Sequence, residues 1–171
     1  MFYCITCISF VYLRMIRINN NYKHKEKIMD QVMTKAIETF KNKVFEDYAG
    51  FNSRSITSIE KNTIEKVPSY QNEVNKRIDA RLQEFKDGFK MVETKYYYKF
   101  LKANGSGQSV HSFIVKEDKE IRRKHWKKGD LLMASSFSQP ALNKPRGNIL
   151  GEYKVQWTGP LYLSGPKGYT L

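Results

Sequence analysis

The chain is poor in cysteine, because among its 171 residues only Cys4 and Cys7 occur, in the sequence CITC. A structural zinc site needs a second pair of ligands, and a disulfide framework needs more cysteines at regular spacings. The composition therefore favours neither kind of cross-link. Since no disulfide has to be kept oxidised, we expect an intracellular protein.

Long hydrophobic runs are also missing. The apolar run at residues 1–13 is shorter than the roughly 20 residues that cross a bilayer as a helix. No charged region precedes it and no small-residue cleavage site follows it, so it makes a poor signal peptide. A short anchor at a membrane interface is the alternative that the sequence leaves open.

The start of the chain has a further explanation. Residues 25–28 read Lys-Glu-Lys-Ile and directly precede Met29, and Lys-Glu can be encoded by a bacterial ribosome-binding sequence. We therefore expect translation to start at Met29. Residues 1–28 would then be an untranslated or disordered leader, and residues 29–171 a single α+β domain. A peptide from the leader in the mass spectrum of the natively expressed protein would contradict this expectation.

The sequence lacks the common motifs of catalysis. Its three histidines, His24, His111 and His125, are scattered without the spacing of metal ligands. No lysine-containing phosphate loop, dinucleotide fingerprint or G-x-S-x-G motif occurs, and the spacing of the acidic residues pairs no two of them. We therefore predict no catalytic residue, no metal site and no cofactor, and a protein that is not an enzyme.

Positive charge and aromatic side chains are abundant. The chain has 30 Lys and Arg against 17 Asp and Glu, a formal net charge of +13, and 13% of its residues are aromatic. Such a charge favours anionic partners, among them nucleic acid, nucleotides, phosphorylated ligands and acidic membranes. A basic protein without any such partner is the alternative.

Two amphipathic helices are predicted in the N-terminal half. Apolar residues recur at steps of three and four along residues 30–49 and again along residues 74–92. Between them, Thr57 and Glu60 have the spacing of a capping box, which indicates a short helix. Two helices alone cannot bury both stripes well, so we expect a further surface to cover them, such as a second copy of the chain. The stripes consist of Met33, Ile37, Phe40, Val44 and Tyr48, and of Val74, Ile78, Leu82, Phe85, Phe89 and Val92.

From residue 95 onward the pattern changes to short β-rich segments separated by turn residues. Residues 95–103 and 109–118 flank the loop NGSGQ, which is typical of a hairpin. The predicted fold class is therefore α+β, with two N-terminal amphipathic helices followed by an antiparallel β-sheet. Further strands are predicted at residues 129–137, 151–157, 160–164 and 168–171.

Basic and aromatic residues together suit a phosphorylated ligand that contains a base. Aromatic rings stack on bases, arginine forks contact phosphates, and asparagine amides read an adenine edge. Arg146 is the leading candidate because it lies in the bent loop KPRGN. For Phe113 and Trp157 the alternative is a place in the core of the sheet, and for the basic run at residues 121–128 it is a solvated loop. The candidate ligand-binding residues are Arg146, Asn148, Phe113, Phe137, Trp157, Arg122 and Arg123.

Three segments of the chain resemble a known family. They are FIVKED, KKGDLLMASSFSQPALNKPRGNI and VQWTGPLYL, preceded by the two amphipathic helices. In this pattern the chain is similar to phage-encoded anti-defence sponge proteins that counter the bacterial Thoeris system, of the first-described type. The resemblance covers roughly residues 30–165, and the leader and the basic segment EIRRKHW depart from it.

The resemblance implies helices followed by an antiparallel sheet, assembly into dimers or higher homo-oligomers, and no catalysis. It also implies that the chain binds a cyclic ADP-ribose-type immune signal, and in some members a cyclic oligonucleotide, and withholds it without degrading it. The expected setting is the cytoplasm of an infected bacterial host, with no membrane partner. Two alternatives stay open: a basic nucleic-acid-binding phage protein, and an oligomeric virion or assembly component.

Overall fold

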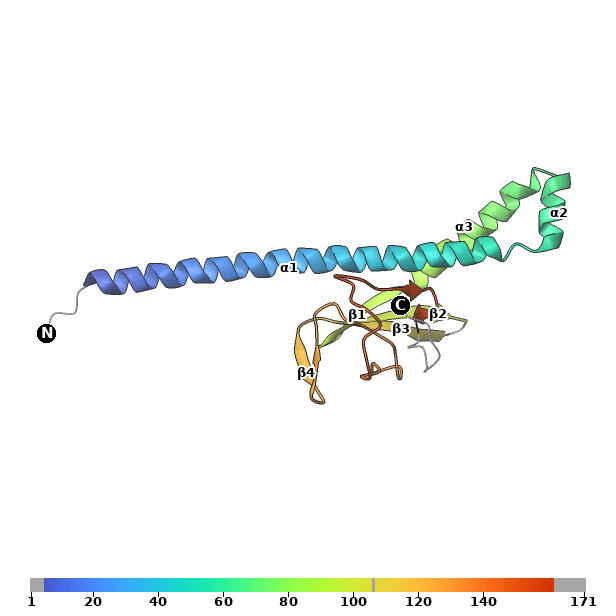
Figure 1. The fold of residues 1–171 in the computed structure, drawn as a ribbon. Helices are drawn as coiled ribbons and strands as arrows, with labels where there is room; N and C mark the ends of the chain where they lie inside the picture. The colour runs from blue at the N-terminus through green and yellow to red at the C-terminus, as the bar shows by residue number, and fades with distance from the viewer. Residues whose placement is uncertain (1–4, 106, 162–171) are drawn as a thin grey trace.

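The computed structural model describes residues 5–105 and 107–161, and it describes side chains from residue 28 onward. The described chain has helices first and antiparallel strands after them, which confirms the predicted fold class (Figure 1). It contains three helices where two long ones were predicted, because the capping-box segment forms a helix of its own. The elements are α1 (Ile5–Arg54), α2 (Ser58–Lys66), α3 (Tyr70–Gly88), β1 (Lys90–Glu93), β2 (Tyr97–Asn104), β3 (Gly107–Val115), β4 (Lys119–Ile121), β5 (Lys124–Trp126), β6 (Leu131–Leu132), β7 (Val155–Gln156) and β8 (Gly159–Pro160).

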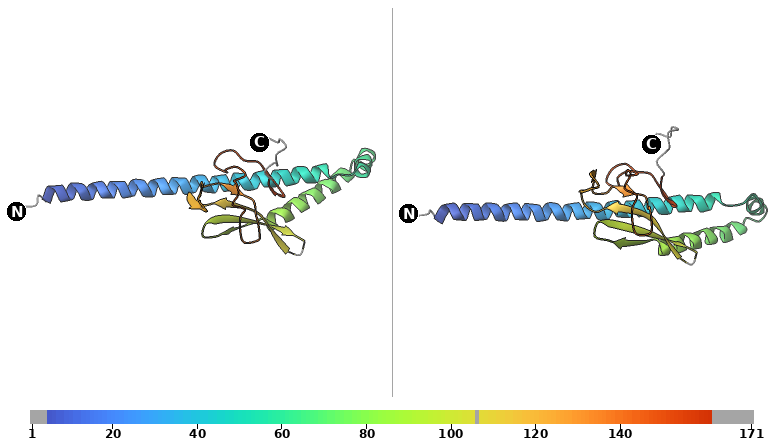
Figure 2. Two further views of the ribbon diagram at one scale, coloured as in Figure 1. Left: turned by 60° about the horizontal axis from the view of Figure 1, so that its bottom comes forward. Right: turned by 90° about the horizontal axis from the view of Figure 1, so that it is seen from below.

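The helix α1 is long and packs on the sheet through part of its length (Figures 1 and 2). Its predicted stripe is confirmed, since Met33, Phe40 and Val44 are at most 2% exposed. The helix extends beyond the predicted range of 30–49 at both ends. It continues past Gly50 to Arg54, and Phe51 in this extension packs against the Trp157 ring. Whether translation starts at Met29 stays a prediction.

The short helix α2 begins with the predicted capping box. The Thr57 Oγ1 atom accepts a hydrogen bond from the Glu60 backbone N–H at 3.2 Å, and the Glu60 carboxylate accepts one from the Thr57 N–H at 2.8 Å. Arg77 of α3 also contacts this carboxylate. These hydrogen bonds, that from the Thr57 backbone first, lower the pKa of Glu60 to about 2. The cap therefore ties α2 to α3 as well as starting it.

The second stripe is confirmed only in part. Val74 and Phe85 are buried on α3, and Phe89 is buried just after it. Val92 was expected on the same helix face, but it is 43% exposed in the edge strand β1. The helix ends at Gly88, where the chain turns into β1. Val92 therefore lies in a strand, and its spacing from Phe89 does not place it on the helix face.

Four strands form the main sheet, in the order β1-β2-β3-β6 with antiparallel pairing throughout. The helices α1 and α3 cover one face, where Phe40, Phe89 and Phe100 stack in a cluster of aromatic rings. On the other face Phe113 and Trp126 belong to a second apolar cluster. Both faces are therefore buried, one under helices and one under the loops after β3.

The strands after residue 129 are shorter than predicted. The segment 129–137 contributes only β6, because after Leu132 the chain bends and its backbone bonds to a loop instead. The segment 151–157 contributes only β7, which pairs with β8 in a separate two-stranded ribbon. Of the predicted strand at 160–164, Pro160 ends β8 and Leu161 is not in a strand; residues 162–164 and the predicted strand at 168–171 lie outside the described residues.

The remaining ribbon, β4 paired with β5, was not predicted, because most of its residues lie in the basic run at 121–128, to which no strand was assigned. Among the described helices, none has both the length and the apolar composition required to cross a membrane.

Candidate functional site

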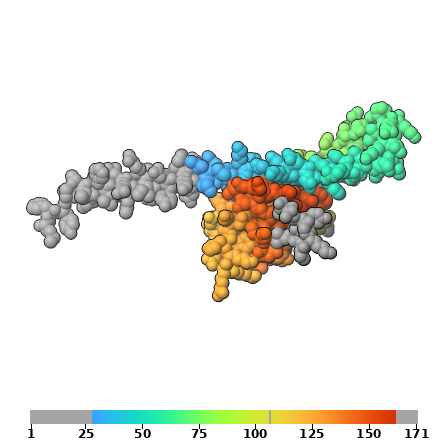
Figure 3. Space-filling view, viewed as in Figure 1, coloured from blue at the N-terminus to red at the C-terminus, as the bar shows by residue number. Residues whose placement is uncertain are grey.

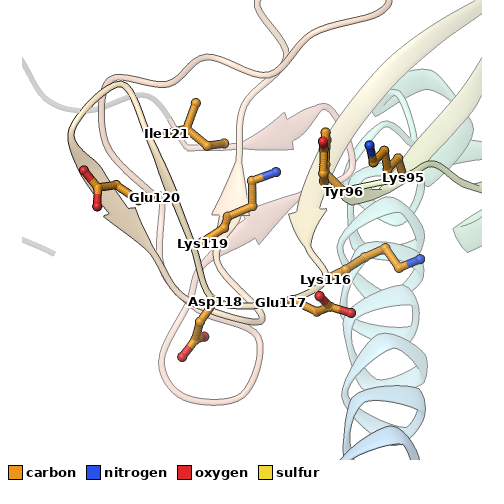
Figure 4. A pocket seen from close by; sticks show the side chains of 8 residues that line it. All are labelled: Lys95, Tyr96, Lys116, Glu117, Asp118, Lys119, Glu120 and Ile121. Atoms are coloured by element: carbon orange, nitrogen blue, oxygen red, sulfur yellow. The ribbon is translucent and has the colours of Figure 1, made fainter.

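A pocket of about 450 Å³ lies between the turn that joins β1 to β2 and the segment that leads from β3 into β4 (Figure 4). We call it the Lys119 pocket. Small-molecule sites in proteins typically occupy about 300–1,000 Å³, so it is large enough for a nucleotide-sized ligand. Its lining consists of Lys95, Tyr96, Lys116, Glu117, Asp118, Lys119, Glu120 and Ile121.

A threonine turn presents the first side of this pocket. The Thr94 backbone N–H donates to the Tyr97 carbonyl at 2.9 Å, and the Thr94 hydroxyl accepts from the Tyr97 N–H at 3.1 Å. Lys95 and Tyr96 therefore occupy the two middle positions of a closed turn, where their side chains project from the sheet. Tyr96 is 48% exposed, so much of its ring is open to solvent and it has no place in the core.

Lys119 presents the opposite side. Its Nζ atom lies 3.4 Å from the centroid of the Tyr96 ring and 5.0 Å from that of Tyr97. Such contacts between an ammonium and a ring contribute about 0.5–2 kcal/mol, depending on how far they are removed from water. Burial lowers the pKa of Lys119 below its ordinary value. The Lys95 ammonium beside the Tyr96 hydroxyl lowers the pKa of that hydroxyl, and Lys119 adds to the effect.

None of the acidic lining residues forms an ion pair with these two lysines, although the Glu117 charge acts on Lys119. Asp118 accepts a hydrogen bond from the Lys128 backbone N–H at 2.6 Å, and Glu120 is directed away from Lys119 across the hairpin (Figure 4). Lys116 pairs with Glu93. Among the described side chains, no carboxylate lies within 4 Å of the Lys95 or the Lys119 ammonium. The pocket therefore offers two ammonium groups and one exposed ring to an anionic ligand.

Arg146, the leading candidate from the sequence, lies elsewhere. It is only 7% exposed, its Nη1 atom donates to the Lys144 carbonyl at 2.7 Å, and its buried Nε atom has no partner among the described residues. Burial lowers its pKa. The guanidinium is thus held within its own loop rather than projected from it.

Asn148 is fully occupied by structural hydrogen bonds. Its amide group donates to the Lys128 carbonyl at 2.9 Å and to the Asp130 carboxylate at 3.0 Å, and its Oδ1 atom accepts from the Leu150 N–H at 2.8 Å. These bonds fasten its loop beside β6. Both donor hydrogens of the side chain are used, so it cannot make the paired donor and acceptor contact that reads an adenine edge.

The aromatic candidates divide between the core and the surface. Phe113 is 1% exposed in the second apolar cluster, and Trp157 packs against Tyr48 and Phe51 of α1. These are the core positions that the sequence offered as the alternative. Phe137 is 56% exposed at a loop, with the Lys99 ammonium 3.6 Å from its ring centroid.

Arg122 and Arg123 form the exposed tip of the β4–β5 hairpin, directly after Ile121 in the wall of the Lys119 pocket. They are the sequence-derived candidates nearest to that pocket, and none of the seven lines it. The sequence analysis missed Lys95, Tyr96 and Lys119. The one local signal is the run KYYYK at residues 95–99. Thr94, directly before it, could have indicated a turn that contains Lys95 and Tyr96.

A second cavity of about 330 Å³ includes Lys102, His111 and Gln156 in its lining. Since the Gln156 carbonyl can only accept, the His111 Nε2 atom, 2.9 Å away, carries the proton. The Nδ1 atom then accepts from the Ser112 hydroxyl at 3.0 Å. Burial above all lowers the pKa of His111 to about 4. Both ring nitrogens are satisfied, so this histidine is a structural part of the core.

No group of three His, Cys, Asp or Glu among the described residues is placed to hold a metal ion. No family model matches the chain, and no curated protein and no solved structure matches it either.

Proposed function

We propose that this chain binds a small, phosphorylated, nucleotide-type signal in the Lys119 pocket and holds it without converting it. The ligand class is a cyclic ADP-ribose isomer or a cyclic oligonucleotide, as the resemblance to anti-defence sponge proteins implies. The observation that supports the proposal is the pocket itself, in which Lys95, Lys119 and Tyr96 face one space of about 450 Å³.

The two ammonium groups are the proposed contacts to phosphate. A hydrogen bond between an ammonium and a phosphate oxygen is charge-assisted and about twice as strong as one between neutral groups. Lys119 gives up only a cation–π contact to make such a bond, because no carboxylate holds it. A phosphate beside Lys119 would also raise its pKa and so offset the lowering that burial causes.

The Tyr96 ring is the proposed stacking surface for a base. At 3.4 Å, the Lys119 ammonium occupies the place above the ring that a base would take. When Lys119 moves to a phosphate, that face of the ring becomes free. Stacking of a base on an aromatic side chain contributes about 1–3 kcal/mol. One lysine movement would thus couple recognition of the phosphate to recognition of the base.

Calorimetric titration with cyclic ADP-ribose isomers and cyclic oligonucleotides tests the proposal. We expect tight binding of at least one of them, and recovery of the same compound, chemically unchanged, after heat denaturation. Recovery of a product would show an enzyme instead. Absence of binding to every compound would favour the alternative of an oligomeric virion or assembly component. Light scattering would then measure the self-association that this alternative requires.

A further inference from the structure

The β4–β5 hairpin stands out from the body of the molecule, away from α1 (Figures 1 and 3). Its strands pair in the register Lys119↔Trp126 and Ile121↔Lys124, so Arg122 and Arg123 form a loop of two residues. Each three-residue strand is about 10 Å long. The hairpin is therefore a short arm with two arginines at its tip.

The base of the arm is fixed. Trp126, at the base, is 2% exposed and belongs to the second apolar cluster, and Ile121, directly before the tip, packs against the same cluster. The Asp130 carboxylate accepts from the Lys127 N–H at 2.8 Å, and the Asp118 carboxylate accepts from the Lys128 N–H at 2.6 Å. These contacts hold the direction of the arm, so its tip is presented rather than left to fold back.

The tip has an unusual backbone. Arg122 has φ +53° and Arg123 has φ +62°, both in the left-handed region. A two-residue hairpin loop with this geometry normally takes Asn-Gly or Asp-Gly, because other side chains are disfavoured there. The loop therefore has two arginines at positions where Asn-Gly would be more stable, and their guanidinium groups lie at the exposed tip of the arm.

The arm is strongly positive. Residues 119–128 contain six Lys and Arg and one acidic residue, Glu120. Within the described part of the chain, no carboxylate lies within 4 Å of Arg122, Arg123 or Lys127. The charge at the tip is therefore available to an external anion.

We propose that this arm binds duplex nucleic acid by entering the major groove, with Arg122 and Arg123 at its leading edge. The major groove is about 12 Å wide and 8.5 Å deep and admits a two-stranded β-ribbon. The exposed two-arginine tip is the part of the ribbon that would enter the groove. A membrane fits less well, because interfacial binding needs exposed apolar side chains, and Trp126 of the arm is buried. The inference is independent of the Lys119 pocket.

Fluorescence anisotropy with a labelled duplex of about 20 base pairs, two turns of B-DNA, tests this inference across salt concentrations. Two double variants form a matched pair. Arg122→Asn/Arg123→Gly removes two charges from the tip and supplies the preferred turn. The control, Lys61→Gln/Lys66→Gln, removes two exposed charges on α2. The first variant should keep or raise the melting temperature. We expect it to bind the duplex at least about tenfold more weakly than the wild type at each salt concentration. The second should bind nearly as the wild type does.

Several results would overturn the inference. They are no binding of the duplex by the wild type, an equal loss in both variants, and equal affinity for a single strand of the same length. Binding to phosphatidylglycerol vesicles in place of the duplex would also overturn it and assign the arm to a membrane surface.

Discussion

The Lys119 ammonium lies 3.4 Å from the centre of the Tyr96 ring, although Tyr96 lies in the turn between β1 and β2 and Lys119 begins β4. Neither residue has a role in the core: Tyr96 is 48% exposed, and no carboxylate among the described residues pairs with Lys119. The contact joins the two sides of the Lys119 pocket. In the proposed function, an anionic ligand with a flat base would replace both halves of this contact at once.

The Tyr96 ring should contribute to ligand affinity through its face. Tyr96→Leu should weaken binding by about 1–3 kcal/mol, because a stacked base loses its partner. Tyr96→Phe keeps the ring and should stay close to the wild type. Calorimetry compares the three proteins; equal losses in both variants would mean that the hydroxyl, and not the ring, makes the contact.

Arg146 should affect folding stability rather than ligand affinity. Arg146→Met keeps a stem of similar size and removes a buried charge that no carboxylate compensates, so the free energy of unfolding should stay within about 1 kcal/mol of the wild type. Arg146→Ala also loses the packed stem and should cost about 2 kcal/mol.

Denaturant unfolding and calorimetry of these two variants provide the check. If Arg146→Met abolishes ligand binding while the protein stays folded, the site belongs in the KPRGN loop, as the sequence suggested, and not in the Lys119 pocket.

His111 should make stability depend on pH. In the unfolded chain its pKa has the ordinary value near 6.5, whereas in the folded chain it is about 4. Between these values the unfolded state binds the extra proton, so the free energy of unfolding falls as the pH falls from about 6.5 toward 4, by up to roughly 3 kcal/mol.

Urea unfolding at a series of pH values tests this. His111→Gln should lose this part of the pH dependence, while the exposed His125→Gln should retain it. An unchanged slope in His111→Gln would assign the acid sensitivity to the carboxylates.

Gly147 should not tolerate a side chain. Its φ is +123°, and an added Cβ would lie 2.7 Å from the Glu152 carbonyl oxygen and 2.7 Å from the Tyr153 Cβ. Gly147→Ala should therefore destabilise the fold by about 3 kcal/mol or more. Gly151→Ala is the control, because there the nearest atom is 4.0 Å away. Thermal melting compares them, and an equal effect of the two substitutions would contradict this account of the loop.

The helices could be predicted because their signal is local. Met33, Phe40 and Val44 are spaced by the helical repeat itself, and the Thr57–Glu60 cap is complete within four residues. The antiparallel hairpin of β2 and β3 follows in the same way from its turn residues. Such features need no knowledge of what lies across the fold.

The site could not be predicted, because side chains far apart in the sequence decide it. Asn148 looked free to read a base, but Lys128 and Asp130 occupy its amide group. Arg146 looked projected, but its loop lies against β6 and buries it. Lys119 meets Tyr96 only through the pairing of β2 with β3, which carries the chain back to the first turn.

The most direct test of the account is calorimetric titration of cyclic ADP-ribose isomers into the wild type and into Lys119→Gln, with Lys61→Gln as the control for loss of one charge. We expect one isomer to bind the wild type and the control equally, and to bind Lys119→Gln at least about tenfold more weakly, as loss of a charge-assisted hydrogen bond implies. Equal affinity for all three proteins would contradict the assignment of the pocket. No binding of any isomer to the wild type would exclude this ligand class, and no binding of any cyclic oligonucleotide as well would contradict the proposed function.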